Sequence, residues 1–236
     1  MISNKGGDEM SKTQYRHELK HIISISDYYA IRHRIRAIAV SDKNVAADGC
    51  YQIRSLYFDN LYDKALQEKI NGVNHREKFR IRLYNGDTSL IKLEKKRKTN
   101  GLCQKDATSI TKEECEAILK GDYCGLLQSG DELKQELYAK IQYQLLRPTT
   151  IVDYRREPYV YQVGNVRITF DMDIRSGLYA KNLFDTNVCM IPIMQNKIIM
   201  EVKYDAFLPQ IICDIIQTGR SQASAFSKYA DCRIYG

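Results

Sequence analysis

Polar and apolar residues alternate with a period of two along eight segments of this chain. Successive side chains on a strand point to opposite faces, so this alternation predicts β-strands. Gly164-Asn165 and Asn85-Gly86-Asp87 separate neighbouring segments and are typical of hairpin turns. The predicted strands are Tyr15–His21, Gln52–Asp59, Glu77–Tyr84, Ser89–Lys98, Thr150–Arg156, Tyr159–Val163, Asn165–Asp173 and Lys197–Tyr204.

Helical spacing of apolar positions marks six further segments. One of them opens on Thr111-Lys112-Glu113-Glu114, which resembles a capping box. Helices between and outside eight strands favour an α+β fold built on a large antiparallel sheet, which can close into a barrel. The predicted helices are Ser26–Val40, Tyr62–Ile70, Thr111–Leu119, Asp131–Leu146, Leu208–Thr218 and Gln222–Ala230.

The polar faces of the strands are rich in lysine and arginine. One predicted strand has Lys78, Arg80 and Arg82 on one face, opposite an apolar face. For any single strand, the ordinary interpretation is a solvated outer face. Taken together, the strands favour another arrangement, because the amphipathic helices need an apolar sheet face and the polar faces repeat clusters of Arg and Lys with single glutamates. We therefore expect the apolar faces outside, under the helices, and the polar faces around a lumen.

Composition adds the chemistry. The chain has 236 residues, with 36 Lys and Arg against 29 Asp and Glu, a formal charge of +7. Two like charges about 6 Å apart at an effective dielectric of about 20 repel by about 3 kcal/mol. A lumen lined by many cations would be strained unless an anion entered it, so we expect a polyanion as ligand. The remaining carboxylates could hold a divalent metal.

Location and organisation follow from what the sequence lacks. No stretch approaches 18 apolar residues, so we expect no transmembrane segment. The polar start is unlike a signal peptide, and seven cysteines without a CxxC pair read as reduced thiols, so we expect a cytoplasmic protein. We expect residues 1–13 to be a disordered leader. The rest of the chain has no internal repeat and no proline-rich linker, so we expect one domain over residues 14–236.

A set of short motifs occurs in a characteristic order. With them, the sequence resembles the VTC-type polyphosphate polymerase domain, a branch of the CYTH-like triphosphate tunnel metalloenzyme superfamily, from about Tyr15 to Tyr229. The motifs are Arg16-His17-Glu18-Leu19-Lys20, Arg54-Ser55-Leu56-Tyr57-Phe58-Asp59, Lys78-Phe79-Arg80-Ile81-Arg82-Leu83-Tyr84, Leu93-Glu94-Lys95-Lys96, Tyr154-Arg155-Arg156-Glu157, Val166-Arg167-Ile168-Thr169-Phe170-Asp171, Met200-Glu201-Val202-Lys203-Tyr204 and Phe226-Ser227-Lys228-Tyr229.

The resemblance implies an eight-stranded antiparallel β-barrel tunnel with a polar, basic lumen and helices packed outside. It further implies binding of ATP and of Mn²⁺ or Mg²⁺, with transfer of the γ-phosphate to a growing polyphosphate chain. The phosphate-gripping residues it implies are Lys20, Arg80, Arg82, Lys96, Arg156, Arg167, Lys203 and Lys228, with Arg54 as a further member and Tyr154 and Ser227 as neutral donors. Glu201 would be the principal metal ligand, with Glu18 and Glu94 also facing the lumen. Of these residues, Lys20, Arg80, Arg82, Glu201 and Lys228 form the expected catalytic set.

Two alternatives stay open. The chain could be a tunnel triphosphatase that hydrolyses ATP or inorganic triphosphate, or a non-catalytic module that binds polyphosphate or nucleotides. Hydrolytic relatives carry ExExK on the first strand, and Arg16 stands here at the first glutamate position, which favours the polymerase. No P-loop or kinase signature is present. Expected partners are ATP and phosphate anions rather than nucleic acid, and a membrane partner protein is compatible with the chain.

Overall fold

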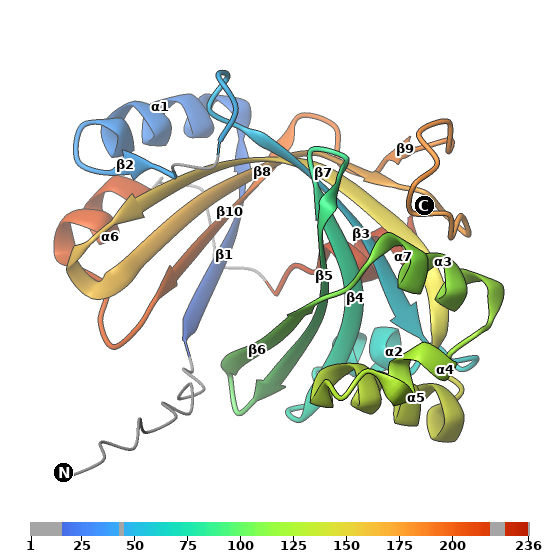
Figure 1. The fold of residues 1–236 in the computed structure, drawn as a ribbon. Coiled ribbons are helices and arrows are strands. Elements are labelled where there is room, and N and C mark those ends of the chain that lie inside the picture. Colours follow the sequence, from blue (N-terminus) through green and yellow to red (C-terminus); the bar gives the residue numbers. More distant parts are fainter. Residues whose placement is uncertain (1–15, 43–44, 218–224, 236) are drawn as a thin grey trace, which may run out of the picture.

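Eight long antiparallel strands form one strongly curled sheet in the computed structural model, which describes residues 16–42, 45–217 and 225–235 (Figure 1). The strand order is β1-β10-β8-β7-β3-β4-β5-β6, and the two-residue strands β2 (Val40–Ser41) and β9 (Ile191–Pro192) pair with β7 and β8. The long strands are β1 (His17–Ser24), β3 (Tyr51–Asp59), β4 (Arg76–Tyr84), β5 (Asp87–Thr99), β6 (Leu102–Ser109), β7 (Arg147–Tyr161), β8 (Val166–Ser176) and β10 (Lys197–Tyr204). The expected leader lies outside the described residues.

The predicted number of long strands is confirmed, but two of the assignments differ. The segment Thr150–Arg156 and the first part of Tyr159–Val163, up to Tyr161, belong to one strand, β7, whose pairing with β8 continues through Pro158. Strand β6 was not predicted, because it is an edge strand with few apolar residues and none of its residues is fully buried.

The sheet curls until its two edge strands meet. In the part of the chain that the structure describes, β1 and β6 are joined by one isolated backbone bridge between Arg16 and Cys103, with N–O distances of 3.3 and 3.4 Å. The concave face of the sheet thus surrounds an interior, and its convex face is left for the helices.

The helices cover the outer face in two groups (Figure 1). One cluster joins α1 and α6 to β1, β8 and β10, where Ile31, Val202 and Ile212 are fully buried. The other joins α3, α4 and α5 to β3, β4 and β5 around Phe79 and Leu137. None of the described helices is long and apolar enough to cross a membrane. The helices are α1 (Ile25–Arg36), α2 (Lys64–Ile70), α3 (Lys112–Lys120), α4 (Cys124–Gln128), α5 (Glu132–Gln144), α6 (Gln210–Ile216) and α7 (Lys228–Ile234).

Local signals in the sequence fix several element ends. The predicted capping box is confirmed at α3, where the Thr111 side chain accepts a hydrogen bond from the Glu114 N–H and the Glu114 carboxylate accepts one from the Thr111 N–H. The β4–β5 hairpin turns at Asn85 and Gly86, which both have positive φ, as a two-residue hairpin of this kind requires.

Helix α7 departs from the expectation that every helix packs outside. Its Tyr229 ring stacks on the Tyr57 ring at 5.1 Å, and the Tyr229 hydroxyl donates to Asp59 at 2.5 Å. Together with Leu66 of α2, these residues form a third cluster that fills one end of the interior. The helix begins at Lys228, whereas a start at 222 was predicted; residues 222–224, like Thr218, lie outside the described ranges.

The outer core should carry much of the stability. Leu137 is fully buried on α5 against the outer face of the sheet, so Leu137→Ala is expected to lower the free energy of unfolding by about 3 kcal/mol. Leu127 on α4 is 50 % exposed, and Leu127→Ala is expected to change it by less than about 0.5 kcal/mol. Urea denaturation of both variants measures the difference; equal losses would show that the outer helices are not held by this core.

Candidate functional site

A cavity of about 810 Å³ occupies the concave interior of the sheet. Among the described residues that line it, lysines and arginines outnumber carboxylates eleven to three, and four tyrosines complete the polar wall. The predicted inside-out polarity is therefore confirmed for this interior, because the same strands bury their apolar faces under the outer helices.

Strands β4 and β5 form the first wall. Arg80 and Arg82 project inward from β4, while Ile81 between them points into the outer core. The Glu94 carboxylate on β5, only 1 % exposed, accepts from Arg80 at 2.7 Å and lies 3.7 Å from Arg82. Arg80 also donates to the Tyr57 hydroxyl at 2.9 Å. Both guanidinium groups are thus held in place before any ligand arrives.

Two further contacts fix Arg82 from the neighbouring strands. Its Nε donates to the Ser55 hydroxyl on β3 and its Nη2 donates to the Tyr154 hydroxyl on β7, both at 3.0 Å. Burial lowers the pKa of Arg82, but its neighbours, Tyr154 and Glu94 among them, outweigh this and raise it overall. The group stays charged at the centre of the cavity wall.

Strands β1 and β10 form a wall of alternating charge. Their antiparallel register places Glu18 opposite Lys203 and Lys20 opposite Glu201. Lys20 lies 3.4 Å from Glu201, and Lys203 lies 3.5 Å from Glu18 and 3.4 Å from Glu201. Burial raises the pKa of both glutamates, but the nearby lysines outweigh burial and hold both values well below the usual range. Both carboxylates are therefore ionised.

Strands β7 and β8 and helix α7 form the third wall. Arg156 makes a two-point ion pair with Asp171, with N–O distances of 2.6 and 2.7 Å, and Asp171 is fully buried. Lys228 at the start of α7 contacts the same carboxylate at 2.5 Å and Glu201 at 2.8 Å. Its ammonium also lies 4.9 Å from the centre of the Tyr154 ring. Helix α7 thus carries a cation into the cavity.

The structure brings most of the expected site residues together. The residues from the expected set that line the cavity are Glu18, Lys20, Arg80, Arg82, Lys96, Tyr154, Arg156, Arg167, Glu201, Lys203, Ser227 and Lys228.

Arg54 and Glu94 depart from that set. Arg54 does not reach the cavity, because it alternates with the inward-facing Ser55 and Tyr57 on β3; its guanidinium pairs with Asp153 at 2.8 Å on the other side of the strand. Glu94 lies behind the arginines, where Arg80, Arg82 and Lys105 already occupy both of its oxygens. The contacts of Glu94 fit a positioning group better than a metal ligand.

Among the lining residues that were absent from the sequence-based set are three that contribute charge or fix a cation. Lys78 shares its strand face with Arg80 and Arg82, and that pattern could have identified it. Lys105 lies on the unpredicted strand β6 and contacts Glu94 at 3.0 Å. Tyr57 could not have been found from spacing, because its role depends on contacts with Arg80 and with α7.

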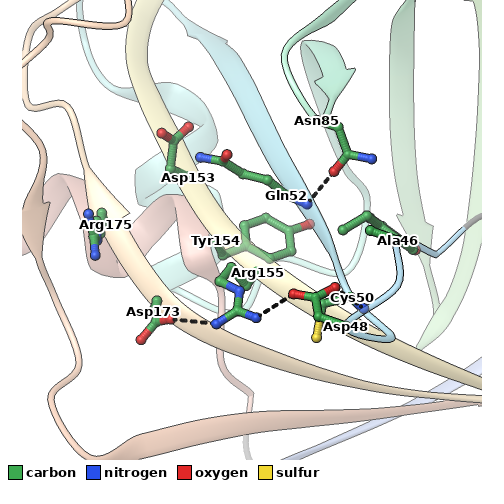
Figure 2. Close-up of a pocket in the computed structure, with 11 residues that line it drawn as sticks. Ala46, Asp48, Cys50, Gln52, Asn85, Asp153, Tyr154, Arg155, Asp173 and Arg175 are labelled. Carbon is green, nitrogen blue, oxygen red and sulfur yellow. Dashed lines mark hydrogen bonds and ion pairs between the residues drawn. The ribbon is translucent and has the colours of Figure 1, made fainter.

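A second pocket, of about 330 Å³, is formed by parts of β3, β7 and β8 and the segment before β3 (Figure 2). There Arg155 lies 2.9 Å from Asp48 and 3.8 Å from Asp173, while Arg175 stands apart. Two arginines and three aspartates nearly balance in this pocket. The cationic excess that an anionic ligand needs is in the large cavity.

Residues 15–234 of this chain match the family model of the VTC domain, and this match covers almost all of the described residues. The chain belongs to the VTC domain family. No curated protein matches it.

Solved structures include proteins that are similar to this VTC domain. A putative adenylyl cyclase from Hippeastrum, described as having a dominant triphosphatase activity, is 15 % identical with a TM-score of 0.51, and the match covers 92 % of this chain and 94 % of that one. A putative adenylate cyclase from Bacillus halodurans is 11 % identical with a TM-score of 0.49, covering 81 % of each chain. The Hippeastrum structure shows that this chain shares its tunnel fold.

Glu18 and Glu201 are the carboxylates that could hold a divalent ion in the VTC domain. Hard divalent ions take oxygen ligands, and both side chains present ionised oxygens to the cavity. Over residues 16–42, 45–217 and 225–235, no group of three or more Asp, Glu, His and Cys side chains is arranged to bind a metal. These residues fit a metal only if phosphate oxygens and water complete its coordination.

Crowding of cations perturbs two lysines in the cavity. Burial, with Lys96, Lys20 and Arg80 nearby, lowers the pKa of Lys78 to about 7. Burial also lowers the pKa of Lys203 to about 8, although Glu201 and Glu18 oppose the shift. An anion that enters the cavity favours the charged form of both lysines, so its binding takes up protons.

ATP binding should therefore weaken as the pH rises from 7 to 9. In this range the γ-phosphate of ATP, whose last proton leaves at about pH 6 as in a phosphate ester, is already ionised, so the protein supplies the pH dependence. Lys78→Met is expected to weaken binding at pH 7 and to flatten this dependence. Calorimetry in buffers of different ionisation enthalpy measures the proton uptake directly. An unchanged pH dependence in the variant would rule out Lys78 as one of its sources.

Proposed function

We propose that the protein is an ATP-dependent polyphosphate polymerase that transfers the γ-phosphate of ATP to a polyphosphate chain in the basic cavity. The observation that carries the proposal is the cavity wall itself, where eleven cations face three carboxylates. An interior with this imbalance suits a ligand with several negative charges in a row.

The arginines suit phosphoryl transfer because they are preorganised. Phosphoryl transfer requires mainly in-line placement of the reacting groups and stabilisation of charge on the transferred oxygens. Arg80 is fixed by Glu94, Arg82 by Ser55 and Tyr154, and Arg156 by Asp171. A guanidinium held from behind can present its remaining donors to phosphate oxygens without first reorganising.

The lysines add adjustable charge around the reacting phosphates. A divalent ion held by Glu18 and Glu201 would neutralise phosphate charge and orient the triphosphate. Lys20 and Lys203, which now pair with these glutamates, can turn on their flexible stems toward phosphate oxygens. Lys228 stays in its ion pair with Asp171, in the wall formed by β7, β8 and α7.

Triphosphate hydrolysis is the second candidate. The solved structure from Hippeastrum, which shares the fold, is described as having a dominant triphosphatase activity. Against this candidate, Arg16 lines the cavity at the position where hydrolytic relatives place a carboxylate, and it pairs with Asp205 at 2.7 Å. A cation in place of a metal ligand favours the acceptance of a second anionic substrate over metal-rich hydrolysis.

One incubation separates the candidates. The protein is supplied with ATP and Mn²⁺, and long-chain phosphate, ADP and free phosphate are measured. A polymerase converts ATP to ADP with chain growth and little free phosphate, whereas a triphosphatase releases phosphate without chains. Binding of polyphosphate with neither product would leave a non-catalytic binding module.

Glu201→Gln is expected to reduce chain synthesis at least 100-fold, because the neutral amide cannot replace the ionised carboxylate at the metal and beside Lys20 and Lys228. Glu132→Gln on the exposed side of α5 serves as the matched control and should retain full activity. Product gels measure synthesis, and thermal unfolding checks that the fold is intact. Full activity in a folded Glu201→Gln protein would contradict the assigned role.

A further inference from the structure

Two smaller hollows extend the main cavity beside the helices that fill one end of the interior. The inner hollow, of about 120 Å³, shares Lys20, Lys78 and Lys96 with the main cavity. The outer hollow, of about 440 Å³, shares a different set with the inner one: Lys69, Arg76, Lys98, Ala225, Phe226 and Ser227. The three spaces therefore adjoin one another and lead from the tunnel to the region between α2 and the segment before α7.

Strand β4 shows how the basic wall continues outward. Its inward row consists of Arg82, Arg80, Lys78 and then Arg76, spaced by about 6.6 Å as alternate strand residues are. Arg76 no longer lines the main cavity but lines both smaller hollows, and its partner across the β4–β5 ladder is Lys98. The row of cations thus runs past the end of the main site.

The cations at this end differ from most of those inside, because no ion pair with a carboxylate holds them within the described part of the chain; among the cations of the main cavity, Lys78 shares this property. Lys69 donates instead to the carbonyl oxygen of Ala225, and Arg76 donates to that of Val73. Burial, with Arg76, Lys20 and Lys98 nearby, lowers the pKa of Lys69. Lys69, Arg76 and Lys98 therefore repel one another, and an anion bound among them would relieve that repulsion.

The carboxylates that line the inner hollow are already engaged. Glu77 lies 3.0 Å from Lys95 and also contacts Lys140, and Glu18 lies 2.7 Å from Lys96. In the outer hollow the carboxyl group of Asp231, whose pKa burial raises, accepts from the Ser227 N–H at 3.3 Å. Asp231 acts on Lys69, so this one carboxyl group offsets only part of the charge of the three cations that line the outer hollow.

We propose that Lys69, Arg76 and Lys98 form a second anion subsite, which binds the part of an inorganic polyphosphate chain that extends beyond the main cavity. This inference rests on the proposed function for its ligand. Its chemistry favours an inorganic chain over single-stranded nucleic acid, which proteins usually hold on rows of stacked aromatic side chains. Phe226 and Tyr229 are the aromatic residues among those described that line either hollow.

The test compares a long and a short ligand on the full chain. The triple variant Lys69→Gln, Arg76→Gln, Lys98→Gln is expected to bind long-chain polyphosphate at least tenfold more weakly than the unmodified protein, with less than a twofold change for inorganic triphosphate. The matched control removes three exposed lysines that line none of these spaces, by Lys120→Gln, Lys181→Gln and Lys197→Gln, and should leave both affinities unchanged. The charge-preserving variant Arg76→Lys, Lys98→Arg should keep tight binding of the long chain.

Four results would overturn the subsite. They are unchanged binding of the long chain, equal losses for long and short ligands, a loss of the same size in the control, and competition by single-stranded oligonucleotides as strong as that by polyphosphate. Because binding is measured without ATP, the outcome is independent of turnover. If the protein makes no polyphosphate but the triple variant selectively loses the long chain, the polymerase proposal fails and the subsite stands. If the protein makes polyphosphate but the triple variant binds the long chain as tightly as the unmodified protein, the polymerase proposal stands and the subsite fails.

Discussion

The fold depends on compensation of positive charge in a confined interior. Eleven cationic side chains share one cavity, and like charges about 6 Å apart repel by about 3 kcal/mol at an effective dielectric of about 20. The protein offsets this repulsion with buried carboxylates, of which Glu94 and Asp171 lie behind the arginines and Glu201 lies among the lysines. A buried carboxylate is tolerated only when it is paired, so its position also fixes the cations around it.

Charge in the interior dictates where the apolar side chains pack. With their polar faces turned inward, the strands bury their apolar faces outside, and two separate clusters of helices are needed to cover them. One end of the interior is filled by α2 and α7 around Tyr57 and Tyr229. Helix α7 therefore serves both needs, since it packs its tyrosine in that cluster and presents Lys228 to the cavity.

Strand parity was enough to predict the lumen, because the side chains of a regular strand alternate without exception between two environments. Strand parity failed to assign side chains where the two faces of a strand do not differ in polarity. Strand β6 is polar on both faces, so its charged Lys105 could not be assigned to the wall. Arg54 was implied by the family resemblance, although its parity matches the outward Leu56. The pairing of α7 with β3 joins residues 170 positions apart, which no local pattern encodes.

The wall of the cavity is held most weakly where the bridge between Arg16 and Cys103 joins β1 to β6. Over the described residues, parting β1 from β6 breaks the two backbone hydrogen bonds of that bridge, a net cost of about 1–3 kcal/mol. It also breaks the 3.7 Å contact of the Cys103 thiol with Glu18 and the ion pair of Glu18 with Lys96 on β5. Parting any other neighbouring long strands breaks a full ladder. For the proposed polyphosphate ligand, this junction is therefore where the wall separates at the lowest cost, and we expect any lateral entry there rather than between other strands.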